Sequence, residues 1–335
     1  MRYYRTDKRI KTLSDWPTML LTFTLSFICW GIGYFYSIGF PLTKGRVVLP
    51  FWDSLCDLFN YRIIGYLTGL LLLLLTAFIM QRISDVEMLI RERTRLPFML
   101  FVLFISTNAG LLPFNEVIVV LLCLVFVIYE LFKSYQQPEA TGTLFNAGFF
   151  IGIAALFIPQ VLWFVPLLWV GMYQFRSLSI RSLMASLVGV LLVYWFVLAW
   201  CTWKHDLSMF TSLFLSLGDF KILGLATTFQ DYQIGTIGMI LILVVALFHI
   251  KMDAFNNSVR VRQMLFFLLN MSIWTLFLMF LYGNDTDSFL AILSLSGSVL
   301  IAYFLENIPR RFRFVLYSFL LVFCAVSFAL RVWNF

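Results

Sequence analysis

Carboxylates that could take part in chemistry occur in two short polar stretches between long apolar runs. The first stretch, LPFWDSLCDLFNYR (residues 49–62), holds Asp53 and Asp57 one helical turn apart. The second, TNAGLLPFNEV (residues 107–117), holds Glu116. A carboxylate can accept a proton from an attacking hydroxyl group or bind a hard divalent cation through oxygen. Asp53 and Glu116 are therefore candidate catalytic residues. The structural alternative is that each acid stabilises the dipole of the helix it begins.

A third polar stretch, WKHDLSMF (residues 203–210), combines a lysine, a histidine and an aspartate. Lys204 and His205 can contact a lipid phosphate, Asp206 can orient His205, and Arg62 is a further candidate phosphate contact. The alternative is a cluster of interfacial side chains that reach from the membrane surface into water. The five cysteines are scattered singly and there are two histidines, which does not indicate a Cys/His zinc site or a disulfide framework. The pattern leaves the need for a divalent cation open.

Lipid must be the solvent for most of the chain that positions these residues. The sequence is 61% hydrophobic and 12% charged, with a mean hydropathy of +0.92. A soluble domain of 335 residues could not bury that much apolar surface. Apolar runs without alternation indicate helices rather than a barrel. The net charge of +7 is typical of basic cytoplasmic loops and does not indicate nucleic acid binding.

We predict one all-α, polytopic transmembrane domain over residues 1–335, with about eleven spans. With the N-terminus inside, 18 of the 24 Lys and Arg residues fall in inner segments, as expected for cytoplasmic loops. The prediction is thus N-in and C-out, in a bacterial inner membrane, with long outer loops at 37–62 and 204–233. The expected spans are 17–36, 63–80, 97–112, 117–132, 144–158, 161–175, 183–203, 234–250, 264–281, 289–305 and 314–332.

The stretch 143–176 carries no charged side chain before Arg176, and we expect it to cross twice. Pro159 ends the first arm, and Pro159-Gln160 forms the outer turn. Gly148 and Gly152 give the first arm a small-residue face for close contact with another helix. The outer segment "LPFWDSLCDLFNYR" is expected to form a short amphipathic helix on the membrane surface. No GxxxxGK[ST] loop occurs, which excludes a P-loop ATPase core.

The segments LFNAGFFIGIAALF (144–157) and LWVGMYQFRSLSIRSLMASLVGVLL (168–192) resemble a multi-spanning inner-membrane family of Bacteroidota to which no activity is assigned. The many spans and the acids of the first two outer loops more distantly resemble the GT-C membrane glycosyltransferases. That resemblance implies transfer of a sugar from a polyprenyl-phosphate donor at the outer face, with Asp53 as the first-loop acid and Glu116 as the second. Asp53 is followed by Ser54, so the paired acids of that family are not evident, and the first loop is short.

Three functions follow as hypotheses. The first is a GT-C-like glycosyltransferase, or a relative of one, acting on lipid-linked saccharides. The second is a non-catalytic membrane subunit of envelope assembly or secretion machinery, with a membrane-protein partner. The third is a lipid or solute transporter, for which a cavity lined by polar residues such as Asn146, Gln160 and Asn270 is expected. Fold analogy alone does not decide among them.

Overall fold

The computed structural model describes residues 16–39, 52–59, 61–90, 94–137, 139–205, 208–221, 244 and 257–333. These residues form helices joined by turns, without a β-strand in the described ranges. The all-α prediction is confirmed for this part of the chain. The α-helices are α1 (Trp16–Tyr36), α2 (Trp52–Phe59), α3 (Arg62–Val86), α4 (Leu96–Ser106), α5 (Glu116–Lys133), α6 (Thr141–Phe157), α7 (Phe164–Gln174), α8 (Ile180–Trp203), α9 (Ser208–Leu215), α12 (Val259–Leu281), α13 (Thr286–Asn307) and α14 (Arg310–Trp333). Short 3-10 helices are η1 (Ala109–Leu111), η2 (Pro159–Trp163), η3 (Ser216–Gly218) and η5 (Gly283–Asp285).

Long apolar helices dominate the bundle. Six of those in the described ranges are long and apolar enough to cross a membrane: α1, α3, α8, α12, α13 and α14. Their length and composition indicate a multi-pass membrane protein. Every predicted span other than 234–250 overlaps a described helix, and 234–250 lies, apart from Val244, outside the described residues.

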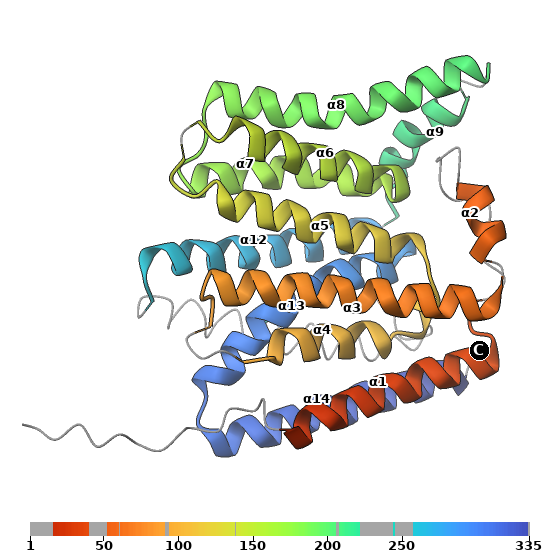
Figure 1. The fold of residues 1–335 in the computed structure, drawn as a ribbon, viewed down its shortest axis with the longest axis vertical. Helices are drawn as coiled ribbons and strands as arrows, with labels where there is room; N and C mark the ends of the chain where they lie inside the picture. The colour runs from red at the N-terminus through yellow and green to blue at the C-terminus, as the bar shows by residue number, and fades with distance from the viewer. Residues whose placement is uncertain are drawn as a thin grey trace, which may run out of the picture.

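The helices run back and forth between two ends, and Figure 1 shows their connections sorted accordingly. One end, at the left of Figure 1, holds the described connecting residues 87–90, 94–95, 134–137, 139–140, 175–179 and 308–309, and is called the basic end here. Contacts at this end include an ion pair of Arg260, in the first turn of α12, with Glu87, and a bond from the Gln136 N–H to the Phe175 carbonyl. The opposite end holds α2, η1, η2, α9 and η5, and is called the long-loop end.

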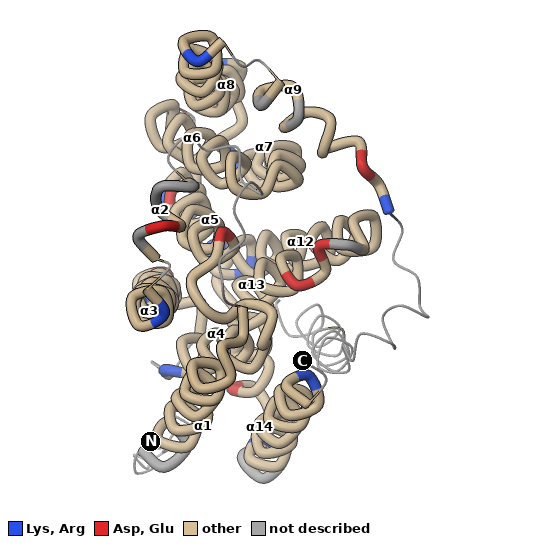
Figure 2. The backbone as a smooth tube through the Cα atoms, turned by 90° about the vertical axis from the view of Figure 1, so that its right-hand side faces the viewer, with Lys and Arg blue, Asp and Glu red and all other residues tan. Residues whose placement is uncertain are grey.

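Helix α13 is the centre of the bundle and is buried along almost its whole length. It packs against α12, α4 and α5, and Figure 2, viewed along the helices, shows these neighbours around it. Ser294 and Ser298 bond to carbonyls of their own helix, and the Ser272 hydroxyl of α12 lies 2.8 Å from that of Ser296. Hydrogen bonds therefore satisfy these polar side chains without water, as an apolar interior requires.

The most extensive packing in the bundle is between α6 and α8. A Cβ atom at Gly148 would lie 2.1 Å from the Ser186 carbonyl oxygen, and one at Gly189 would lie 2.3 Å from the Phe145 carbonyl oxygen. A Cβ at Gly152 would lie 3.0 Å from a methyl group of Val193. Glycine on both helices thus allows the two backbones to approach closely, as small residues do between membrane helices.

Two predicted spans differ in detail from the observed helices. The span expected over 97–112 ends at Ser106, because the Asn108 side chain accepts a bond from the Gly110 N–H and turns the chain into η1 before the cis bond at Leu112-Pro113. The span expected over 161–175 begins as the 3-10 helix η2 and becomes α-helical only at Phe164. At 1.5 Å per residue, the 11 residues of α7 extend about 17 Å.

Candidate functional site

The two candidate catalytic acids lie on elements of the long-loop end. Helix α2 carries Asp53, whose side chain lies outside the described residues. Buried Trp52 fixes α2 by ring contacts to Phe114 and Phe157, at 5.9 and 5.5 Å between centroids. Phe114 stands two residues before Glu116, which occupies the first turn of α5. Asn115 is the residue that caps α5, since its side chain accepts from the Ile118 N–H at 3.2 Å.

The candidate phosphate contacts lie on separate elements. Lys204 and His205 are exposed at the C-terminal end of α8, where the Lys204 ammonium lies 5.6 Å from the Trp200 ring centroid. Arg62 begins α3 and stacks on Tyr34 at 4.6 Å. Helix α8 packs on α6 and α9, and α6 packs in turn on α5, which begins at Glu116. The helix that ends at Lys204 and His205 is therefore connected to the elements of the acids through α6. Asp206 lies outside the described residues.

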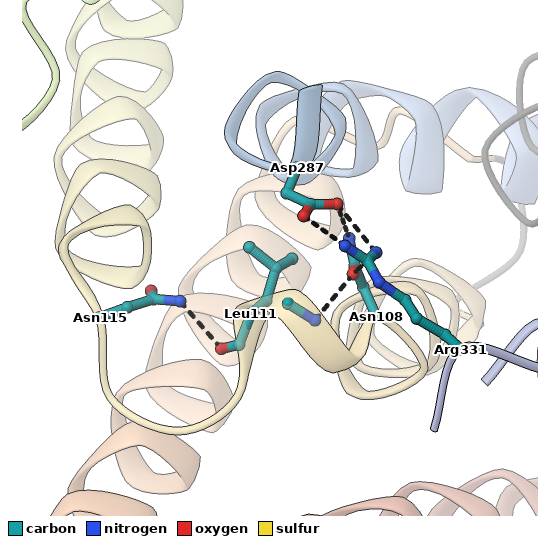
Figure 3. Close-up of polar contacts among 6 residues, drawn as sticks. Asn108, Leu111, Asn115, Asp287 and Arg331 are labelled. Carbon is teal, nitrogen blue, oxygen red and sulfur yellow. Dashed lines mark hydrogen bonds and ion pairs between the residues drawn. The ribbon is translucent and has the colours of Figure 1, made fainter. Parts of the chain in front are cut away.

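A partly buried charge cluster joins three distant segments at the long-loop end (Figure 3). Both guanidinium nitrogens of Arg331, near the end of α14, bind the Asp287 carboxylate at the start of α13. The same arginine donates to the Asn108 side-chain oxygen, and the Asn108 amide donates to Asp287 at 3.3 Å. A Cβ at Gly110 would lie 2.6 Å from an Asp287 oxygen, so any larger residue at this position would collide with the Asp287 carboxylate. The cluster fastens η1, α13 and α14 together.

A tyrosine anchors the described part of the second long loop. The Tyr282 hydroxyl donates to the Leu217 carbonyl at 2.6 Å and accepts from the Trp163 indole N–H at 2.9 Å. Burial raises the pKa of Tyr282, the bond from Trp163 acts in the opposite direction, and the Asp219 carboxylate raises it again. The hydroxyl therefore keeps its proton at neutral pH and remains a donor. Residues 208–221 thus form a short helical segment that is tied to η5.

A cleft lies between α7 and α12 and extends from the basic end toward the middle of the bundle. Its volume is about 890 Å³. Its walls combine apolar and aromatic side chains with three amides and one arginine: Val170, Tyr173, Gln174, Arg176, Gln263, Phe266, Leu269 and Asn270. This composition is typical of small-molecule sites, which are mostly apolar with a few polar groups that fix orientation.

Side-chain amides form a polar line along this cleft. The Asn270 amide donates to the Gln174 oxygen at 3.4 Å, and the Gln174 amide donates to the Gln263 carbonyl at 2.8 Å. Asn270 is eleven residues from the start of α12, about 17 Å along the helix at 1.5 Å per residue. Because an amide offers two donor hydrogens and two acceptor lone pairs, the bond to Gln174 does not exhaust Asn270. The Asn270 side chain therefore offers hydrogen-bond donors and acceptors close to the middle of a helix long enough to cross a membrane.

Arg176 stands at the mouth of the cleft in an unusual backbone conformation. Its φ is 57°, in the left-handed region that usually holds glycine or asparagine at a helix end. The Ser177 N–H bonds to the Met172 carbonyl at 3.0 Å and so closes the last turn of α7. The turn exposes Arg176 beside the cleft, where its guanidinium can bind a phosphate or carboxylate.

Reasoning from the sequence did not find the cleft or the charge cluster. In the sequence, Arg176 is only the first charged residue of the stretch 143–176. Asn270 is named there as a polar residue expected in a transporter cavity, and it does line the cleft. The other two residues named for such a cavity lie elsewhere: Asn146 is exposed on α6, and Gln160 bonds to Asp285 at the long-loop end. The described residues hold no cluster of three or more His, Cys, Asp or Glu side chains placed for a metal ion.

Comparison with known proteins adds one match. Residues 38–335 match the model of a family of unknown function, DUF6427. Neither the curated proteins nor the solved structures contain a match to the chain.

Proposed function

Because the chain belongs to the DUF6427 family, whose function is unknown, we propose a function from its own residues: it binds a phosphate-bearing lipid of the polyprenyl-phosphate-linked saccharide class in the cleft between α7 and α12. The observation that carries this proposal is the combination of three amides, one arginine and aromatic walls in a cleft of about 890 Å³.

Each part of such a ligand has a counterpart in the cleft. Amide side chains donate to and accept from hydroxyl groups, so Gln263 and Asn270 suit a saccharide. A guanidinium binds phosphate oxygens in a planar, two-pronged arrangement, which suits Arg176 at the mouth. Phe266, Leu269 and Val170 offer apolar surface to the lipid chain.

The proposed setting is an inner membrane crossed about eleven times, with the basic end in the cytoplasm. Arginines at the connections of that end support this orientation, since Lys and Arg are enriched in cytoplasmic loops. Arg95, Arg176, Arg181 and Arg260 are examples at or beside these connections. In this orientation the cleft opens to the inner leaflet, where it would receive a lipid made on the cytoplasmic side. Binding there suits a protein that moves the lipid or presents it to another protein.

Binding of a long-chain polyprenyl phosphate to the purified protein tests the proposal. Arg176→Asn is the informative variant, because asparagine tolerates the left-handed conformation and the end of α7 is kept. A lost charge-assisted contact is worth about 1.5–3 kcal/mol, so we expect binding to weaken at least tenfold. Arg181→Asn removes the same charge from an exposed position five residues on and should bind like the wild type. Equal binding by all three proteins would reject the cleft as the site.

A second candidate function, GT-C-like sugar transfer at the outer face, is favoured by one specific observation. The contact of Trp52 with Phe114 holds the helix that carries Asp53 against the start of α5, where Glu116 lies. In this hypothesis Asp53 is the base or cation ligand, Glu116 is the second acid, and Lys204, His205 and Arg62 contact phosphate. Asp53→Asn and Glu116→Gln would abolish glycan assembly in cells that require the protein. Normal assembly in both variants, together with a partner that co-purifies in fixed proportion, would instead favour a non-catalytic subunit.

A further inference from the structure

A second pocket lies at the basic end, between α1, α3 and α4, on different helices from the cleft. Its volume is about 610 Å³. Two arginines line it: Arg82 from α3 and Arg95 immediately before α4. The remaining wall is mostly apolar and includes Met19, Phe23, Phe78 and Phe98. A polar rim thus adjoins an apolar wall in one pocket at the end of membrane-length helices.

Hydrogen bonds from Gln81 fix the polar side of this pocket. The Gln81 amide donates to the Asp85 carboxylate at 2.9 Å and to the Thr94 carbonyl at 2.8 Å. Its oxygen accepts from the Phe98 N–H at 3.4 Å, in the first turn of α4. These bonds hold the start of α4, with its positive dipole end, against the pocket. That dipole end favours a negative charge nearby.

The charges that line the pocket match one phosphodiester. Arg82 and Arg95 carry two positive charges and Asp85 one negative charge, so the lining has a net charge of one positive unit. A phosphodiester carries one negative charge. The rings of Phe23 and Phe98, 5.7 Å apart between centroids, form an apolar surface beside it. Basic pockets between membrane helices are known binding sites for anionic lipid head groups.

We propose that this pocket binds the phosphodiester head group of an anionic membrane phospholipid, with an acyl chain along Phe23 and Phe98. The proposal does not rest on the function proposed for the cleft. Phosphate chemistry has two sources, a lipid head group or free phosphate, and the apolar wall favours the lipid. Bound in this way, the phospholipid would hold the ends of α1, α3 and α4 together at the membrane surface.

The thermal stability of the purified protein in detergent tests the proposal. Three additions are compared: phosphatidylglycerol, phosphatidylethanolamine with the same acyl chains, and inorganic phosphate. We expect only phosphatidylglycerol to raise the apparent Tm. Each arginine near a membrane surface contributes enough to change the affinity about fivefold. Arg82→Gln and Arg95→Gln should each weaken the phosphatidylglycerol response by about that factor. Arg181→Gln, which removes an exposed arginine at the same end, should leave it unchanged.

Three results would overturn the proposal. An equal response to phosphatidylethanolamine, which has the same phosphodiester but no net charge, would show that the net negative charge of the lipid is not recognised. A full response to inorganic phosphate would show a free-phosphate site. An equal loss in Arg181→Gln would show attraction by the general charge of this end. If the glutamine variants fail to fold, selective retention of phosphatidylglycerol over phosphatidylethanolamine by the wild type, measured by native mass spectrometry, decides the question.

Discussion

Replacing Arg331 by glutamine removes a guanidinium that binds Asp287 through two nitrogens and Asn108 through one. The side chains of Arg331 and Asp287 are 18% and 30% exposed, so the pair is neither fully buried nor freely solvated. Breaking a buried pair costs about 3–5 kcal/mol, and an exposed pair contributes about 0.2–1 kcal/mol. For this intermediate exposure we expect Arg331→Gln to destabilise the protein by about 2 kcal/mol.

A double-mutant cycle separates the pair from its surroundings. Asp287→Asn leaves the arginine without its carboxylate and should also cost about 2 kcal/mol. The double variant removes both charges together, so its loss should be about 2 kcal/mol rather than the 4 kcal/mol of two independent changes. At about 2 °C per kcal/mol for a large protein, each variant should lower the apparent Tm by about 4 °C, measured in one detergent at one scan rate.

The control is Arg181→Gln. Arg181 lies 3.9 Å from Glu139, and both side chains are more than four-fifths exposed, so its removal should leave the Tm unchanged because such pairs contribute little. If the losses from Arg331→Gln and Asp287→Asn are additive in the double variant, the ion pair does not act as one unit. Additive losses would mean that the two residues stabilise the protein separately and do not fasten α14 to α13.

Gly148→Ala should destabilise the bundle by about 1–3 kcal/mol through overpacking, because its Cβ would lie 2.1 Å from the Ser186 carbonyl oxygen. Gly142→Ala, on the same helix with no atom within 4 Å of its Cβ, is the matched control, and equal Tm values for the two would contradict this packing. Tyr282→Phe removes the bonds to Leu217 and from Trp163. Two bonds at about 1 kcal/mol each should hold back trypsin cleavage after Lys221 by about thirtyfold in the wild type, so the variant should be cleaved faster by about that factor. An unchanged rate would show that these bonds do not hold the segment.

The helices could be predicted from the sequence because backbone groups in lipid have no water to bond and must form hydrogen bonds within the chain. An apolar run such as 183–203 must satisfy its own hydrogen bonds and therefore becomes a helix, as α8 does. The end of α4 was harder to predict, since the chain turns there through the Asn108 side chain, which accepts from the Gly110 N–H. This bond is not visible as a change in hydropathy, so the apolar run alone extended the expected span to residue 112.

Contacts between distant segments could not be predicted from the sequence. Arg331 and Asn108 are 223 positions apart, and neither position carries a local signal that names the other. The cleft also depends on packing between distant segments, since α7 packs beside α12. The acids at Asp53 and Glu116 were found by type and location alone, and their chemical role remains a prediction.

A photoreactive amino acid placed at Val170 tests whether the cleft binds a polyprenyl-phosphate-linked saccharide. Val170 lines the cleft, and Val188 on α8 is its matched control, since their exposed fractions are 49% and 51%. After irradiation in cells, the mass of the attached lipid identifies what lies beside each position. We expect a polyprenyl-phosphate-linked adduct at residue 170 and bulk phospholipid at residue 188. The same phospholipids at both positions would show that the cleft does not bind the proposed lipid.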